Sequence, residues 1–521
     1  MTPSRTFVRV FATAFLGSAV LLPVGRAEVK VTPVFGDHMV LQREMATPIY
    51  GTAEAGEQVT VKFRDQEKTT TAGADGKWVV KLDKLKVGGP DELTIGTLTI
   101  KDVLVGDVWI GSGQSNMEIA SKGFMAGDPV LAKIVADGPY PQLRIFSTRG
   151  KKIWEEATPQ TLEYFSALLF SFGLPLQKEI GVPVGLMSPA VGGTPSGYWL
   201  SEEAYRSDAA CKAAAEKFAQ TYDFDAAKAK YDRDLADWKA AAEAAKSDGK
   251  PAPRGPNAPA KAGESTGKIG NLYEAHVRPM VGFGIRGVLW DQGEAGTAIT
   301  GVDQYTLMGA LIRGWRQEWG QNEFPFLYVE KPSGEGCAWD PTDPVTNKAS
   351  PFAPLPAQVP PLIAGLYRET HIRIMQYPQT AMVTSSDLGN MTHPTNKSGY
   401  GLRAARVALG MVYGRKIEIY GPLYASHQIE GDKVRIRFSH TGQGLAAPQA
   451  QKLQGFAIAG EDQKFVWGDA VIDGDSVIVS SASVPKPAAV RYAWSQQIPW
   501  ANLFNKDGLP APAFRTDAWE R

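Results

Sequence analysis

The chain has 521 residues, 43% of them hydrophobic, and its 55 basic side chains balance its 55 acidic ones. This length is enough for about two to four domains with hydrophobic cores of their own. Because neither sign of charge is in excess, the composition excludes a protein built to bind a polyanion, and we expect no nucleic-acid partner.

Residues 1–27 have the pattern of a secretory signal peptide. Arg5 and Arg9 flank the start of an apolar run, Val10 to Val24, and small residues stand at the cleavage position before Glu28. The run is too short and interrupted for a membrane span, and no later segment is long and apolar enough for one. We expect a secreted or periplasmic protein without stable membrane insertion; an uncleaved anchor is the alternative.

Residues 29–101 predict a β-sandwich-like module. Apolar and polar residues alternate over 59–63 and 78–82, and residues 74–77 carry the glycine of a turn. His38 lies on this module, far upstream of any catalytic residue, so we assign it a structural role.

The catalytic region begins at about residue 102 and contains a candidate nucleophile. The apolar strand 108–110 runs into a glycine-flanked turn, and Ser115 stands where a helix can begin. Such a position lies at the carboxyl edge of an α/β sheet, where ligands bind, and the helix start offers N–H groups to an oxyanion. Alternatively Ser115 is only an N-cap, with Glu118 completing a capping box.

The next buried strand, 182–187, leads to the adjacent glycines Gly192 and Gly193. Two glycines after a strand allow a backbone N–H to approach a ligand closely, as an oxyanion hole requires. The same pair also fits an ordinary turn.

Residues of about 203–263 predict a helical insertion. Aromatic residues recur at helical spacing from Phe218 to Trp238, and residues 249–263 are rich in proline, alanine and glycine. The insertion is either a lid over the site or a plain surface addition.

Three histidines lie in the catalytic region. His393, followed by Pro394, comes after the strand at about 382–386 and before a helix from about 398 to 411. A serine nucleophile needs a base, so His393 is the candidate. We expect His276 and His371 to be structural, with substrate contact as the alternative for His276.

Residues 416–521 return to a β pattern, with two strands predicted around the turn 473–475. The two cysteines, Cys211 and Cys337, can form one disulfide in an exported protein, although their separation neither supports nor excludes it. No histidine lies nearby at ligand spacing, so we expect no metal site.

Three blocks of the chain together resemble the sialate O-acetylesterase family of SGNH carbohydrate esterases. Residues 113–117, Gly-Gln-Ser-Asn-Met, are similar to its nucleophile block, residues 290–294 to a second block, and residues 393–397, His-Pro-Thr-Asn-Lys, to a third. The resemblance covers nearly the whole chain. It implies an SGNH-type three-layer α/β/α catalytic domain with a parallel sheet over 102–415, flanked by N- and C-terminal β-rich modules.

The resemblance also implies a function: hydrolysis of O-acetyl groups on carbohydrates, O-acetylated sialic acids first, through an acetyl-enzyme. An acetylxylan or other plant-glycan acetylesterase is one alternative. A glycan-binding protein with a degenerate esterase site is another. No metal or organic cofactor is implied, and the oligomeric state is not indicated. The implied nucleophile is Ser115, the base is His393, and the oxyanion and substrate groups are Gly192, Gly193, Gln292, Gln114 and Glu294.

One departure from the family concerns the group that orients His393. The family has an aspartate two residues before this histidine, and many SGNH enzymes have one three before; here those positions are Met391 and Asn390. Asp387 is our first candidate for the missing carboxylate, ahead of Asp291 and a backbone carbonyl. If no carboxylate reaches His393, we expect an enzyme with a lower rate or one that has lost its activity. Gln292 has an alternative too, in which it and Glu294 only bind neighbouring loops.

Overall fold

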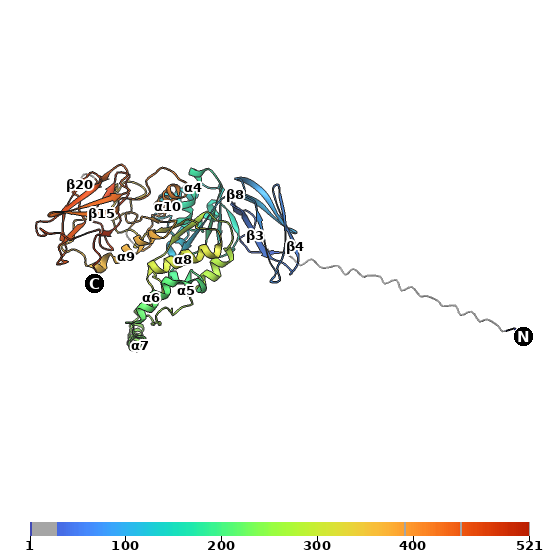
Figure 1. The fold of residues 1–521 in the computed structure, drawn as a ribbon, viewed down its shortest axis with the longest axis horizontal. Helices are drawn as coiled ribbons and strands as arrows, with labels where there is room; N and C mark the ends of the chain where they lie inside the picture. The colour runs from blue at the N-terminus through green and yellow to red at the C-terminus, as the bar shows by residue number, and fades with distance from the viewer. Residues whose placement is uncertain (3–28, 390–391, 449–450, 520–521) are drawn as a thin grey trace.

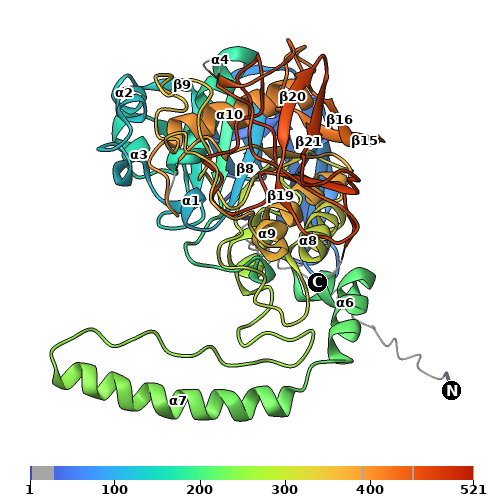
Figure 2. The ribbon, with the colours of Figure 1, turned by 90° about the vertical axis from the view of Figure 1, so that its left-hand side faces the viewer.

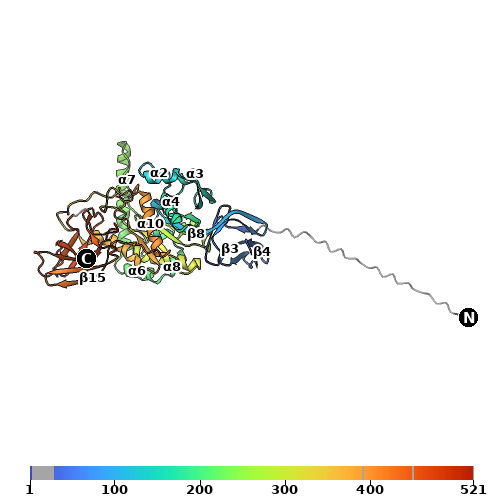
Figure 3. The same cartoon turned by 90° about the horizontal axis from the view of Figure 1, so that it is seen from above.

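The computed structural model describes residues 1–2, 29–389, 392–448 and 451–519. Most of the predicted signal peptide, together with Asn390 and Met391, lies outside the described residues. The chain is a mixed α/β protein with one large mixed sheet and several smaller β-sheets (Figure 1). The β modules lie at opposite ends of the central part (Figure 3).

The N-terminal module forms from short strands with the alternating burial that the sequence predicts, as in β4 and β6. One sheet has the order β1-β3-β6, and the other strands pair with one another or with the start of β8. The bounds are β1 (Lys30–Val31), β2 (Val40–Gln42), β3 (Thr47–Thr52), β4 (Gln58–Phe63), β5 (Gln66–Thr71), β6 (Lys77–Leu82) and β7 (Gly88–Ile95).

Strand β8 (Leu98–Gly113) joins the N-terminal module to the central sheet. Its first half pairs with β2 and β7, and its second half pairs in parallel with β11 and β12. The boundary expected near residue 101 therefore falls inside a continuous strand, which makes the two parts one hydrogen-bonded unit.

The central sheet has the strand order β10-β9-β11-β8-β12-β13-β14. Only β10 is antiparallel to its neighbour, so the carboxyl ends of the other six strands meet at one edge. The bounds are β9 (Tyr140–Ser147), β10 (Trp154–Ala157), β11 (Val184–Ser188), β12 (Gly287–Asp291), β13 (Phe326–Val329) and β14 (Thr380–Val383).

Helices lie on both sides of this sheet. In Figures 1 and 2, α4 (Ala167–Ile180) and α10 (Lys397–Met411) lie above it, and α8 (Gln304–Trp319) and α9 (Leu362–Arg373) lie below it. Local signals set the helix ends: Ser166 caps α4 by accepting from the Leu169 amide, and left-handed Gly181 ends that helix. Three shorter helices are α1 (Ser115–Glu118), which follows β8 at the carboxyl edge, α2 (Pro129–Ala136) and α3 (Pro159–Glu163).

The insertion consists of α5 (Glu202–Ser207), α6 (Ala209–Ala219) and α7 (Phe224–Ser247). Helix α7 has no buried residue, and it projects from the body with the following segment beside it (Figure 2). This arrangement favours the surface insertion over the lid.

The C-terminal module has its own hydrophobic core, built on two four-stranded sheets, β15-β16-β21-β20 and β19-β18-β22-β24. As predicted, β20 and β21 form a hairpin around Gly474. The bounds are β15 (Leu423–Glu430), β16 (Lys433–Ser439), β17 (Leu445–Ala446), β18 (Phe456–Ala459), β19 (Val466–Trp467), β20 (Asp469–Asp473), β21 (Ser476–Ser480), β22 (Ala489–Tyr492), β23 (Phe504–Asn505) and β24 (Phe514–Arg515).

Cys211 and Cys337 are both free and buried, so the structure does not contain the disulfide that the sequence left open. Across the described ranges, no helix combines the length and the apolar character needed to cross a bilayer.

Candidate active site

Ser115 is placed by a turn that only glycine can make. Gly113 ends β8 with a φ of 131°, and a Cβ on it would lie 2.1 Å from the carbonyl oxygen of Asp291 at the end of β12. The Gln114 amide donates to the same oxygen at 2.9 Å. Because β8 and β12 end together, the next residue, Ser115, emerges at the carboxyl edge as the first residue of α1.

His393 reaches Ser115 from the loop between β14 and α10. Its Nε2 lies 2.8 Å from Ser115 Oγ, although the two residues are 278 positions apart. Ser115 is half-buried and His393 is exposed. The capping box does not form, because Gln114 is the N-cap of α1 and makes no side-chain cap bond. The structure thus brings the predicted nucleophile and base together.

Neither candidate aspartate forms a hydrogen bond with His393. Asp387 is fully buried, and its two oxygens accept from Arg403 at 3.2 and 2.9 Å. Asp291 is also buried and lies 2.5 Å from Lys331 Nζ. Among the residues that the structure describes, no carboxylate hydrogen-bonds His393. The expectation for Asp387 fails because a buried carboxylate must be paired, and Arg403 is its partner.

The glycine pair lies beside the nucleophile, but one of its amides is already engaged. A Cβ on Gly192 would lie 3.4 Å from Ser115 Cβ. The Gly192 N–H donates to Glu118 Oε2 at 2.5 Å, and Glu118 also forms an ion pair with Arg149. Gly193 has a φ of 70°, and within the described chain neither its amide nor that of Ser115 has an acceptor.

Gln292 is committed to neighbouring loops, as the second interpretation of this residue had it. Its Nε2 donates to the carbonyls of Gly296 at 3.0 Å and Thr194 at 3.4 Å, and its Oε1 accepts from Gln304 at 3.0 Å. The structure therefore leaves no free amide hydrogen on Gln292 for an oxyanion.

Glu294 is the centre of a partly buried polar network beside the nucleophile turn. It accepts from Gln114 Nε2 at 2.7 Å, Asn116 Nδ2 at 3.2 Å and Lys331 Nζ at 2.7 Å. Burial by itself raises the pKa of Glu294, but Lys331 outweighs it and holds that pKa below its usual value. Burial keeps the pKa of Asp291 raised. Gln114 and Glu294 thus tie the nucleophile turn to the end of β12.

Two residues that the sequence reasoning left without a role join this network. Asn116, next to Ser115, donates to the carbonyl of Thr392 at 3.0 Å, and its Oδ1 accepts from Lys397 Nζ at 2.6 Å. Both residues stand in the blocks that carry the family resemblance, which is the signal that marks them.

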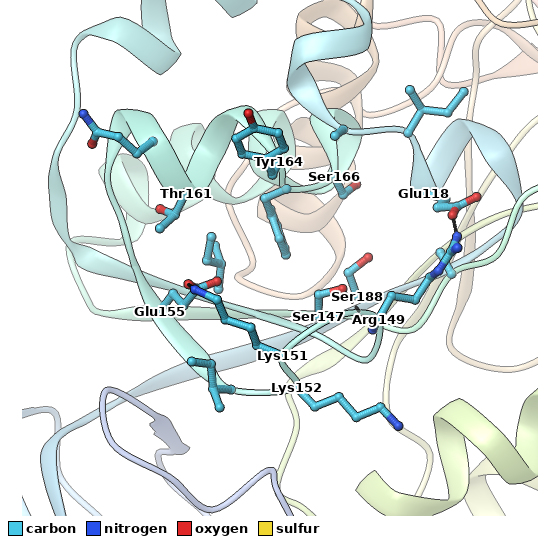
Figure 4. A pocket seen from close by; sticks show the side chains of 18 residues that line it. Glu118, Ser147, Arg149, Lys151, Lys152, Glu155, Thr161, Tyr164, Ser166 and Ser188 are labelled. Carbon is cyan, nitrogen blue, oxygen red and sulfur yellow. Dashed lines mark hydrogen bonds and ion pairs between the residues drawn. The ribbon is translucent and has the colours of Figure 1, made fainter.

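A cavity of about 760 Å³ opens beside α1, between the ends of β9 and β11 and the helix α3. Its lining includes Glu118, three positions after Ser115, and Ala190, which forms a β-bridge with Gly113, but not Ser115 or His393. Figure 4 shows Arg149, from the loop between β9 and β10, directed at Glu118, with the hydroxyls of Ser147 and Ser188 close by. The volume is that of a typical small-ligand site.

The other two histidines of the catalytic region, His276 and His371, make structural hydrogen bonds. His276 Nδ1 bonds Thr148 Oγ1 at 2.9 Å, and burial lowers its pKa. His371 is buried on the Tyr367 carbonyl, and burial lowers its pKa to about 4.

His38 lies 2.6 Å from Asp102, at the start of β8 and far from Ser115. His38, Asp102 and Glu156 could approach a metal ion, but the Arg144 guanidinium already pairs with Asp102 at 3.0 Å and with Glu156 at 3.6 Å.

Comparisons with known proteins place this geometry among esterases. No family model matches the chain. It is 27% identical over 537 residues to a sialate O-acetylesterase of Rattus norvegicus, covering 92% of each chain. It is 25% identical over 545 residues to a sialate O-acetylesterase of Homo sapiens, covering 91% of this chain and 90% of that one.

Among solved structures, a carbohydrate acetylesterase from Xanthomonas citri superposes with a TM-score of 0.72 at 29% identity, covering 94% of this chain and 100% of that one. The resemblance predicted from the sequence motifs is confirmed, and with it the enzyme class, a carboxylic ester hydrolase.

Proposed function

We propose that this carboxylic ester hydrolase, a relative of the sialate O-acetylesterases, removes O-acetyl groups from carbohydrates through an acetyl-enzyme. The observation that carries the proposal is the 2.8 Å contact between Ser115 Oγ and His393 Nε2 at the carboxyl edge of the sheet. A hydroxyl at hydrogen-bond distance from an imidazole is the arrangement that serine esterases use.

The proposed reaction has two halves. Ser115 Oγ attacks the acetyl carbonyl carbon while His393 Nε2 takes its proton, and the bond to the sugar oxygen then breaks as His393 protonates that oxygen. Water next attacks acetyl-Ser115 and gives a proton to His393. Acetate leaves, and the proton returns to Ser115 Oγ. No cofactor takes part in these steps.

The developing oxyanion needs N–H donors. The amides of Ser115 and Gly193 lack an acceptor in the described chain, and they border the nucleophile, so we assign them this role. The Gly192 amide joins them only when Glu118 releases it. Losing one such donor typically costs about 10²–10³ in rate.

We also propose that the catalytic part, residues 102–415, is a three-layer α/β/α domain of the SGNH type. Its support is a central sheet with parallel strands and helices on both sides. The signal-like residues 1–27 support a secreted or periplasmic location, and we expect the mature protein to begin after Ala27.

O-acetylated sialic acid is the substrate we propose first, because a carboxylated sugar suits the basic loop of the cavity. Arg149, Lys151 and Lys152 line it, against Glu118 and Glu155. We expect Arg149→Ala to raise KM for an O-acetylated sialic acid by about 10-fold or more, the usual effect of losing a charged hydrogen bond. KM for 4-nitrophenyl acetate is unchanged.

Lys151→Ala is the control for this experiment, since Lys151 pairs with Glu155 at 3.2 Å, whereas Arg149 pairs with Glu118 on the nucleophile helix α1 (Figure 4). Acetate release from a panel of acetylated sugars tests the substrate itself. A clear preference for acetylxylan, with Arg149→Ala without effect, would reject the sialate assignment in favour of a plant-glycan esterase.

The second candidate is a glycan-binding protein without turnover. It draws on one observation, that no carboxylate in the described residues bonds His393. Hydrolysis of 4-nitrophenyl acetate that disappears in Ser115→Ala excludes it; binding of acetylated glycan without acetate release supports it.

A further inference from the structure

We propose that Asn116 and Lys397 act as a pair of positioning residues that holds His393 within reach of Ser115. The inference rests on the proposed function of Ser115 and His393. It assigns roles to two buried side chains that the reaction itself does not use.

Asn116 ties the two catalytic segments together one residue away from each reactive group. It follows Ser115 in α1, and its Nδ2 donates at 3.0 Å to the carbonyl of Thr392, which precedes His393. Asn116 is 2% exposed, so its amide has little access to water and depends on its protein partners, although Thr392 itself is exposed. The bond therefore sets the spacing between the serine turn and the histidine loop.

Lys397 decides which way the Asn116 amide faces. Its Nζ donates to Asn116 Oδ1 at 2.6 Å, while Nδ2 faces the acceptors on Thr392 and Glu294. If the amide were reversed, its NH₂ group would face the ammonium and its oxygen would face two acceptors. Only one orientation satisfies all three partners, and in that orientation Asn116 donates to the histidine loop.

The environment of Lys397 is costly for an amine, which gives the contact its weight. Lys397 is 1% exposed at the start of α10, and the Phe124 and Tyr400 rings, with centres 4.6 and 5.2 Å from its Nζ, offset only part of its lost hydration. No carboxylate of the described chain lies within ion-pair distance of it. Burial lowers its pKa to about 7. A buried amine without an ion pair is unfavourable for folding alone.

The expected consequence is a loss in kcat, because a displacement of about 1 Å at a catalytic group can cost about 100-fold in rate. Asn116→Asp keeps the size of the side chain and the acceptor for Lys397, but it cannot donate to Thr392. With 4-nitrophenyl acetate, we expect its kcat to fall by about 10- to 100-fold with KM changed by less than about threefold.

A double-mutant cycle tests whether the two residues act as one unit. We expect Asn116→Ala and Lys397→Met each to lower kcat, and the double variant to be no slower than Asn116→Ala, because Lys397 acts through Asn116. Arg491→Met is the matched control: it removes a buried cation, 2.9 Å from Asp517, in the C-terminal module. It lowers stability and leaves kcat unchanged.

The outcomes are distinguishable from a failure of the proposed function. If the Ser115→Ala variant hydrolyses 4-nitrophenyl acetate at the wild-type rate, both proposals are overturned. Hydrolysis that depends on Ser115 while Asn116→Asp retains kcat within about twofold overturns the positioning pair alone. So does a fall in kcat for Arg491→Met equal to that for Lys397→Met, since loss of stability would then explain both. If Lys397→Met does not fold, Asn116→Asp decides.

Discussion

At the residue scale, the position of Ser115 at the sheet edge depends on backbone geometry rather than on a charged side chain. Gly113 lets β8 end against β12, and this close approach turns Ser115 outward at the sheet edge. The His393 ring is held by its loop and by the contact with Ser115, while both candidate aspartates have buried cations as partners. The site thus depends on placing two segments accurately, and the contacts beneath it serve that placement.

Lys397 gives a pH dependence of stability. Burial lowers the pKa of Lys397 to about 7 from the ordinary 10.5, and the positive charge of Lys331 lowers it further by a smaller amount. The carboxylates of Asp291, Glu294 and Asp128 act in the opposite direction and raise it. Between these two values the unfolded chain binds more protons than the folded one, so Lys397 makes stability rise with pH by up to about 1.4 kcal/mol per unit.

The measurement is the free energy of unfolding by urea at pH 7, 8.5 and 10, for the wild type and Lys397→Met. We expect the difference between the two to change with pH across this window, since the variant lacks the titrating amine. A constant difference would show that Lys397 titrates at its ordinary pKa in the folded protein.

Sequence could predict the residues that react but not all of those that support them. Ser115 and His393 stand in blocks whose residue types already specify the chemistry. The prediction that Asp387 orients His393 was wrong. The sequence does not show that Arg403, sixteen positions later, donates to the Asp387 carboxylate. The role of Asn116 depends on three partners far along the chain, which only the fold brings together.

At the element scale, β8 organises the molecule. It starts in the N-terminal module and ends at the nucleophile, and its second half lies between β11 and β12. Its buried second half reads as an apolar run in the sequence, as a strand covered on both faces does. The period-two strands of both modules were predictable too, but continuity through residue 101 was not, because the pattern changes there without a break in the strand.

Helix α7 is expected to be dispensable for catalysis. Ala241→Pro in its exposed middle breaks the helix locally, a cost of about 3 kcal/mol, and no buried residue of α7 transmits the loss to the body. We expect kcat/KM for 4-nitrophenyl acetate to stay within about twofold, with reduced helix content by circular dichroism.

Ala310→Pro, in the buried part of α8, is the contrasting variant, and we expect it to unfold the catalytic part. A fall of more than 10-fold in kcat/KM for Ala241→Pro would instead make the insertion a functional lid.

At the scale of the whole molecule, one buried arginine joins the catalytic part to the C-terminal module. Arg368 on α9 pairs with Glu330 at 3.0 Å and donates to the carbonyls of Ser495 at 3.0 Å and Gln496 at 2.7 Å. Its side chain is fully buried, so its donors have no access to water. The module is thus fixed to the catalytic part through polar contacts as well as by packing.

Removing this arginine is expected to destabilise the protein. Arg368→Met leaves Glu330 buried without its cation, which typically costs about 3–5 kcal/mol. Denaturant unfolding measures the loss, and Arg373→Met, exposed at the end of the same helix, is the control with little change. Equal stability of the two variants would mean that Glu330 finds another partner.

The central claim is that Ser115 and His393 work as one catalytic unit, and the most direct measurement is a kinetic cycle with 4-nitrophenyl acetate. We predict that Ser115→Ala and His393→Ala each lower kcat by about 10³-fold or more, and that the double variant is no slower than the worse single variant. Effects that multiply in the double variant, or a Ser115→Ala protein that retains the wild-type rate, would contradict the account.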